Sequence, residues 1–203
     1  MSEATPGPTL RGTPFSPGVL ILGGGAVLLS LFLLVGFLLP QSWEAEATAD
    51  LPVSATALFP LLDSPEGWRG WTPWPESGVE RSGPARGAGA SLSWDDPDLG
   101  DGSFTIVSAT EPTSVAYAVR VEGGSMSTDG SLTLQPIGPM GTGVRVTWRE
   151  QGDLGWSPLM GYWALSMRRV QSAELSKGLD RLRALALDSV GPADGAPPAP
   201  ISP

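Results

Sequence analysis

The chain has 203 residues, a formal net charge of −9 and neither cysteine nor histidine. The lack of these two residue types excludes disulfides, thiolate and imidazole metal sites, and Ser-His-Asp or Cys-His catalysis. Because the balance is acidic and Lys177 is the single lysine, we expect no nucleic-acid partner.

Proline and small residues dominate both ends of the chain. Residues 1–17 and residues 191–203 are rich in proline, glycine, alanine and serine. Such composition cannot bury enough apolar surface to order the backbone, so we predict disordered tails. The remainder, less an apolar segment at 18–39, has the length of one ordinary domain.

The apolar segment 18–39 contains no charged residue. At about 1.5 Å per helical residue it spans about one hydrocarbon core, which predicts a single-pass transmembrane helix. A cleaved signal peptide is the alternative, because Ala45-Glu46-Ala47 is a small-residue cleavage pattern. The segment is longer than a signal h-region of roughly 7–15 residues, which favours the anchor.

Charges flank the apolar segment unevenly. Arg11 precedes it, whereas Glu44, Glu46 and Asp50 follow it. The positive-inside rule therefore predicts a cytoplasmic N-terminus in the cell membrane and a domain outside the cytoplasm.

The domain begins with a strand and two short helices. Alanines at 45, 47 and 49 alternate with polar residues, which predicts a first strand over 43–50. Ser54 is placed to cap a short helix ending near Asp63, and a second helical turn is expected at 65–69.

From Val79 onward, short segments of period two are separated by glycine, proline and aspartate. This pattern predicts an antiparallel meander with strands near 78–83, 88–95, 103–110, 114–122, 130–136 and 142–151. Apolar residues on alternate positions of these strands are expected to share the inner face of the sheet.

A long amphipathic helix is expected to close the domain. Met160, Trp163, Met167 and Val170 recur at helical spacing, and leucines from 175 to 185 continue the pattern with a small change of phase near Glu174. An antiparallel sheet with its helices on one side belongs to the α+β class.

Several segments resemble one known family over residues 43–190. They are 58–68 with the tryptophan-rich turn 71–74, the strand 87–94, the hairpin 100–102, the strand 141–148 and the helix 175–182. On these segments the chain is identified as a member of the START-like (SRPBCC) superfamily, in its polyketide cyclase/dehydrase and lipid-transport group.

The resemblance implies a helix-grip fold, in which a curved antiparallel sheet surrounds the long C-terminal helix. It also implies a cavity that binds a hydrophobic or amphipathic small molecule. We expect a lipid-like or polyketide-like ligand and no cofactor. Aromatic and sulfur side chains on the elements around such a cavity are the expected ligand contacts: Trp71, Trp74, Trp94, Tyr117, Trp148, Tyr162, Trp163 and Met167.

The tryptophan-rich turn and the acidic candidates also have structural interpretations. Trp68, Trp71 and Trp74 recur every three positions and are expected to fill one end of the core, with ligand stacking as the alternative. Glu150 continues the inward alternation and, with Tyr117, is the candidate acid or base, but strand ends fray and we expect an exposed Glu150. Glu174 is expected in solvent.

Two charged clusters carry no site. Asp95, Asp96, Asp98 and Asp101 lack the glycine and glutamate spacing of a calcium loop, so we expect a solvated turn and no metal. The Arg168-Arg169 pair, like Arg181 and Arg183, is expected on a solvated helix face.

Three functions remain open from the residues. The first is membrane-anchored binding of a hydrophobic small molecule. The second is a cyclase or dehydratase that uses a cavity carboxylate or tyrosine. The third is an interaction module with a filled core and no ligand. The residues leave the oligomeric state and the ligand's identity undetermined.

Overall fold

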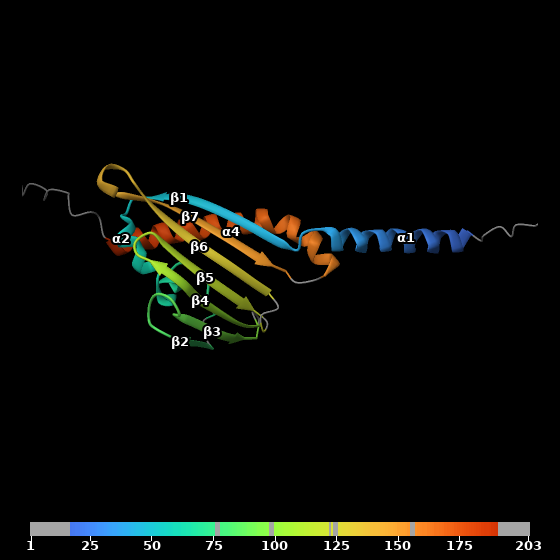
Figure 1. Ribbon diagram of the computed structural model, residues 1–203, viewed down its shortest axis with the longest axis horizontal. Helices are drawn as coiled ribbons and strands as arrows, with labels where there is room; N and C mark the ends of the chain where they lie inside the picture. Colours follow the sequence, from blue (N-terminus) through green and yellow to red (C-terminus); the bar gives the residue numbers. More distant parts are fainter. Residues whose placement is uncertain are drawn as a thin grey trace, which may run out of the picture.

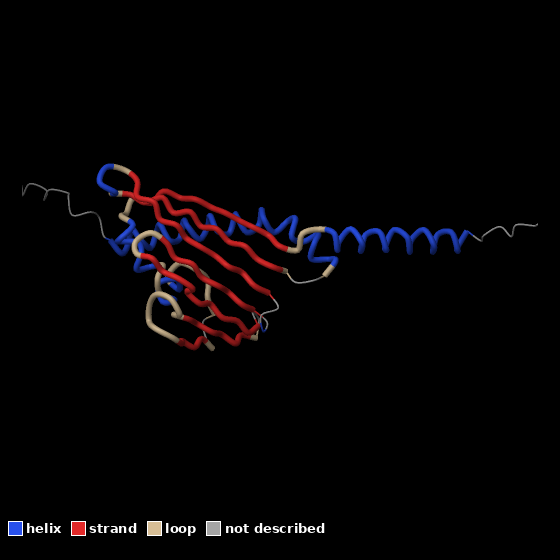
Figure 2. Tube along the Cα trace, viewed as in Figure 1, coloured by secondary structure: helices blue, strands red, loops and turns tan. Residues whose placement is uncertain are grey.

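The computed structural model describes residues 17–75, 78–97, 100–121, 123, 126–154 and 157–190. A seven-stranded antiparallel sheet packs against one long helix, and an apolar helix projects from the domain (Figures 1 and 2). The strands are β1 (Ser42–Leu51), β2 (Val79–Ser82), β3 (Ser91–Asp96), β4 (Gly100–Thr110), β5 (Ser114–Val121), β6 (Met126–Ile137) and β7 (Gly143–Asp153).

The sheet order is β1-β7-β6-β5-β4-β3-β2. Strands β2 to β7 follow one another as a meander, and β1 pairs with β7, so the first and last strands lie side by side. The predicted α+β helix-grip architecture is confirmed. Strand β6 begins at Met126, four residues before the predicted start, and β3 begins at Ser91, after Gly87 and Gly89 with positive φ.

Two short helices follow β1, as predicted. Ser54 caps α2 (Ala55–Leu58) by accepting from the Ala57 amide at 3.2 Å. A 3₁₀ turn (Phe59–Leu61) continues it, and α3 (Pro65–Arg69) starts at Ser64, which accepts from the Gly67 amide. The caps satisfy amides that have no partner within a helix.

The long helix α4 (Pro158–Val190) lies along one face of the sheet (Figure 1). Its second half buries Leu175, Leu179 and Leu182 against the inner face, where they share one core with α2, α3 and β1. Glu174 is exposed, as expected. The helix spans its whole range as one element, including the region of the phase change.

The N-terminal helix α1 (Pro17–Leu38) is uncharged, and nearly all of its window Ile21–Leu38 is exposed. Its length and apolarity suffice to cross a membrane. The tails predicted to be disordered, residues 1–17 and 191–203, lie outside the described residues except for Pro17, which begins α1.

Candidate functional site

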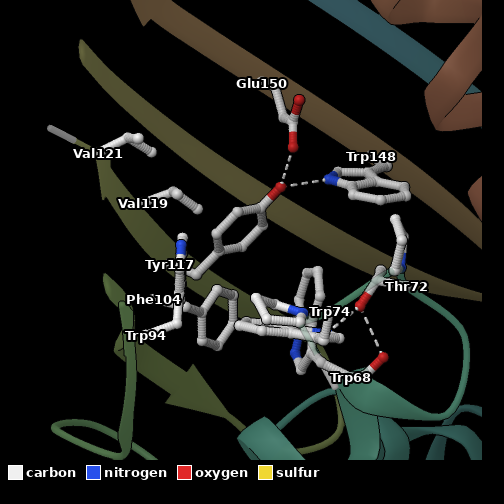
Figure 3. Close-up of a pocket in the computed structure, with 12 residues that line it drawn as sticks. Trp68, Thr72, Trp74, Trp94, Phe104, Tyr117, Val119, Val121, Trp148 and Glu150 are labelled. Carbon is white, nitrogen blue, oxygen red and sulfur yellow. Dashed lines mark hydrogen bonds between the residues drawn. The ribbon is translucent and has the colours of Figure 1, made fainter. Parts of the chain in front are cut away.

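A cavity of about 340 Å³ lies between the loop after α3 and the inner face of the sheet (Figure 3). Helix α3 and the loop contribute one wall, and strands β3, β4, β5 and β7 contribute the rest. The lining residues are Trp68, Thr72, Pro73, Trp74, Pro75, Trp94, Phe104, Tyr117, Val119, Val121, Trp148 and Glu150. Most of this surface is apolar, with few polar groups, which is typical of sites for small hydrophobic molecules.

The tryptophan loop is held in place by its own indole groups. Trp68 Nε1 donates to the Leu62 carbonyl oxygen at 2.6 Å, and Trp71 Nε1 donates to that of Leu61 at 3.2 Å. Both side chains are 2% exposed, so the predicted core role is confirmed for them. Trp71 belongs to the core and is not among the cavity's lining residues.

Trp74 is different, because it is half-buried and faces the cavity (Figure 3). Its Nε1 donates to Thr72 Oγ1 at 2.6 Å, and that hydroxyl donates to the Trp68 carbonyl oxygen at 2.7 Å. Its ring meets Trp94 and Phe104 edge-on, with centroids 5.6 and 5.3 Å apart. The indole is therefore fixed in orientation while one side remains available to a ligand.

Tyr117 and Glu150 form the polar end of the cavity. Tyr117 on β5 is in register with Gly130 on β6, and Gly130 is in register with Glu150 on β7. A Cβ at Gly130 would lie 2.1 Å from Tyr117 Cζ, so the ring occupies the space that a side chain at 130 would fill. Across this glycine, Tyr117 Oη donates a short hydrogen bond to Glu150 Oε1 (Figure 3).

Two further side chains complete this network. Trp148 Nε1 donates to Tyr117 Oη at 2.7 Å, and Gln171 Nε2 from α4 donates to Glu150 Oε2 at 2.7 Å. Gly178 on α4 makes room for Trp148, because a Cβ there would lie 2.5 Å from Trp148 Cζ3. Every polar atom of the pair thus has a partner, as buried polar groups require.

The expectation that Glu150 lies exposed was wrong, because the residue is only 7% exposed. Strand β7 continues to Asp153, so Glu150 stands inside the paired region and keeps the inward alternation. Burial raises the pKa of Glu150, while the hydrogen bonds from Tyr117 and Gln171 lower it. Burial, followed by the nearby Glu150 charge, raises the pKa of Tyr117 well above its ordinary value.

This arrangement has the chemistry of an acid-base pair in an apolar space. A carboxyl group with a raised pKa exchanges a proton nearer neutral pH than an exposed one. Within the described residues, no group of histidine, cysteine, aspartate and glutamate side chains is suited to hold a metal ion. Asp95 and Asp101 are exposed in the β3-β4 hairpin, and Asp98 lies outside the described residues.

The structure divides the predicted ligand contacts into two sets. Trp74, Trp94, Tyr117 and Trp148 line the cavity. The remaining predicted contacts on α4 lie elsewhere: Tyr162 stacks on Phe32 of α1, Trp163 is 54% exposed, and Met167 packs against the core.

Several lining residues were absent from the predicted ligand contacts. Phe104 on β4 and Val119 and Val121 on β5 hold alternate positions, as expected for the inner face, but they line the cavity only because the loop after α3 folds over this part of the sheet. Pro73 and Pro75 are the sequence neighbours of Trp74, and this adjacency is the only sequence signal that could have marked them as lining residues.

The family model described as polyketide cyclase/dehydrase and lipid transport matches residues 42–186. No curated protein sequence matches the chain.

Solved structures share the fold at low sequence identity. Norcoclaurine synthase from Thalictrum flavum, a point mutant in complex with a transition-state analogue, superposes with a TM-score of 0.54 at 12% identity, covering 74% of this chain and 97% of that one. The di-domain ARO/CYC StfQ from the steffimycin biosynthetic pathway superposes with a TM-score of 0.54 at 14% identity, covering 74% of this chain and 52% of that one.

Proposed function

The chain belongs to the polyketide cyclase/dehydrase and lipid transport family, and from this membership we propose that it is a membrane-anchored protein that binds a hydrophobic small molecule. The observation that carries the proposal is the apolar cavity lined by Trp74, with the hydrogen-bonded side chains of Tyr117 and Glu150 as polar groups in its wall. Desolvation of the walls supplies the affinity, and the two polar side chains orient the ligand.

The dimensions of the cavity favour a small ligand. A volume of about 340 Å³ lies at the lower end of the range for small-molecule sites. Indole and phenyl groups from Trp74, Trp94 and Phe104 offer ring faces and edges at little entropic cost. We infer a compact aromatic compound or one short acyl chain, with a carbonyl or hydroxyl group directed at the Tyr117-Glu150 end.

The proposed anchor is α1, with its N-terminus in the cytoplasm and the domain outside it, at the cell membrane. The position of the cavity supports a ligand drawn from the membrane. Strand β1 leaves α1 at Ser42, which pairs with Asp153, and along the neighbouring strands Val121 lies at the same end of the sheet. Because Val121 lines the cavity, the cavity extends to the end of the sheet nearest the anchor.

Acid-base catalysis is the second candidate function, favoured by the Tyr117-Glu150 hydrogen bond inside the cavity. Norcoclaurine synthase and StfQ share only the fold with this chain, so they add no residue roles. If Glu150 transfers a proton, Glu150→Gln should abolish turnover while leaving ligand affinity nearly unchanged, because the amide keeps the shape of the carboxyl group but cannot exchange the proton.

The test of binding is mass spectrometry of small molecules extracted from the full chain, reconstituted in lipid nanodiscs. Val119→Phe is the matched variant, because it fills the cavity with apolar atoms and keeps the polar end. A stoichiometric compound that is retained by the wild type and absent from Val119→Phe supports the proposal. An empty wild-type protein that also fails to bind fluorescent apolar probes would leave an interaction module without ligand.

A further inference from the structure

Helices α1 and α4 are packed against each other through two glycines. A Cβ at Gly36 would lie 2.1 Å from the Pro158 carbonyl oxygen, and one at Gly161 would lie 2.4 Å from the Gly36 carbonyl oxygen. Only glycine allows this approach, so the start of α4 is held beside the last turns of α1 (Figure 1).

An aromatic contact extends the same interface deeper along α1. The Tyr162 ring stacks on Phe32 with centroids 4.4 Å apart and planes 3° from parallel. Tyr162 Oη also donates to the Phe32 carbonyl oxygen at 2.7 Å. Phe32 precedes the end of α1 at Leu38 by six residues, which is about 9 Å at about 1.5 Å per residue.

The first turns of α4 have the composition of a membrane-interface segment. Residues 158–167 carry no charge, and Arg168 and Arg169 follow directly. Leu159 and Trp163, four residues apart, lie on one helix face and are 56% and 54% exposed. Helical side chains tilt toward the N-terminus of their helix, so Leu159 and Trp163 lean toward the level of Phe32 along α1.

We propose that Pro158–Met167 of α4 lies in the bilayer interface beside α1, with Leu159 and Trp163 in contact with lipid. This inference rests on the membrane anchor proposed above. If the window Ile21–Leu38 spans the hydrocarbon core, the Gly36-Gly161 contact places the first turns of α4 at the boundary between acyl chains and headgroups. Tyrosine and tryptophan are enriched at this boundary, and arginines just beyond it reach the headgroup phosphates.

The partner is therefore the lipid surface itself. Leu159 and Trp163 are exposed on the part of α4 that packs against α1, and the apolar side chains of α1 are exposed too, so one bilayer can cover both without a second protein. The consequence for function is a fixed orientation, since a domain held by two adjacent helical segments keeps the anchor end of the sheet at the membrane.

The absence of cysteine provides a direct test. A nitroxide attached to the single cysteine of Leu159→Cys, in the full chain in phosphatidylcholine vesicles, reports collision rates with oxygen and with a water-soluble nickel chelate. Leu28→Cys in α1 marks the hydrocarbon core, and Met140→Cys, at a side chain 99% exposed in the β6-β7 turn, marks water.

We expect the ratio of oxygen to nickel collisions at position 159 to exceed that at 140 several-fold. A ratio at 159 equal to that at 140, with a high ratio at 28, would overturn the proposal while leaving the anchor intact. A low ratio at 28 would refute the anchor and this inference with it. Spin-spin broadening at 159 without oxygen exposure would indicate a contact between two copies and would also overturn it.

Discussion

Tyr117 and Glu150 are hydrogen-bonded although their strands are not neighbours, because Gly130 on the intervening strand has no side chain. The tyrosine ring crosses β6 above this glycine and reaches the carboxyl group on β7. The polar end of the cavity therefore depends on three residues in one row across the sheet. Each of the three can be changed separately.

Gly130→Ala should disrupt this row. A methyl group 2.1 Å from Tyr117 Cζ forces the ring to move and breaks its bond to Glu150. We expect a loss of about 1–3 kcal/mol in the free energy of unfolding, as for other overpacked sites. Urea unfolding measures the loss, with Ser131→Ala on the opposite face of β6 as the control. An unchanged stability would contradict the contact.

Tyr117→Phe should raise the pKa of Glu150 further. The tyrosine hydroxyl favours the ionised carboxylate, and its removal leaves burial opposed mainly by the Gln171 hydrogen bond. The infrared carbonyl band of the protonated carboxyl group follows this titration, with Glu150→Gln as the blank. Tyr162→Phe, whose hydroxyl bonds the Phe32 carbonyl oxygen, should leave the midpoint unchanged.

Glu150→Gln should change how stability depends on pH. Burial raises the pKa of Glu150 in the folded protein, so folding favours its protonated form. The stabilisation from protonated Glu150 is fully present below the unfolded pKa of about 4.3 and is lost as pH rises through the higher folded pKa. The wild type should therefore lose stability relative to Glu150→Gln as pH rises through this window. Urea unfolding of the wild type and Glu150→Gln across this pH range tests this. Stabilities that change in parallel with pH would contradict a raised pKa of Glu150.

Trp74→Ala should weaken binding of a fluorescent apolar probe without unfolding the protein, because the side chain is half-buried at the cavity. Loss of its apolar contact should cost about 1–2 kcal/mol, roughly a tenfold loss of affinity. Trp74→Phe keeps a ring and should retain most of the affinity. Equal affinities of Trp74→Ala and the wild type in a fluorescence titration would place the probe elsewhere.

Asp63→Asn should destabilise the fold more than removal of an exposed ion pair. Both Asp63 oxygens accept from Arg86, and the hydrogen bond to Asp63 raises the pKa of Arg86. Asp63 is 8% exposed but Arg86 is about half exposed, so solvent screening reduces the loss expected from charged hydrogen bonds to about 1–2 kcal/mol. Glu66→Gln, in the exposed pair with Arg81, should change stability little. Equal effects in thermal unfolding would argue against a role for burial.

The sequence alone determined the order of elements and the class of fold. Period-two alternation identifies strands such as β5 and β7, because successive side chains in a strand point to opposite faces. The uncharged apolar segment predicts α1, and Ser54 marks the start of α2 through a local hydrogen bond. These features depend on residues near one another in the chain.

Which residues form the cavity depends on how distant segments of the chain pack together. Glu150 is buried because β7 extends beyond it and α4 supplies Gln171, and Trp74 lines the cavity whereas Trp71 does not because of how the loop folds over the sheet. Gly130, Gly161 and Gly178 have no local signature, since their role is to make room for residues distant in sequence. Such contacts arise from the packing of separate elements, which no local pattern specifies.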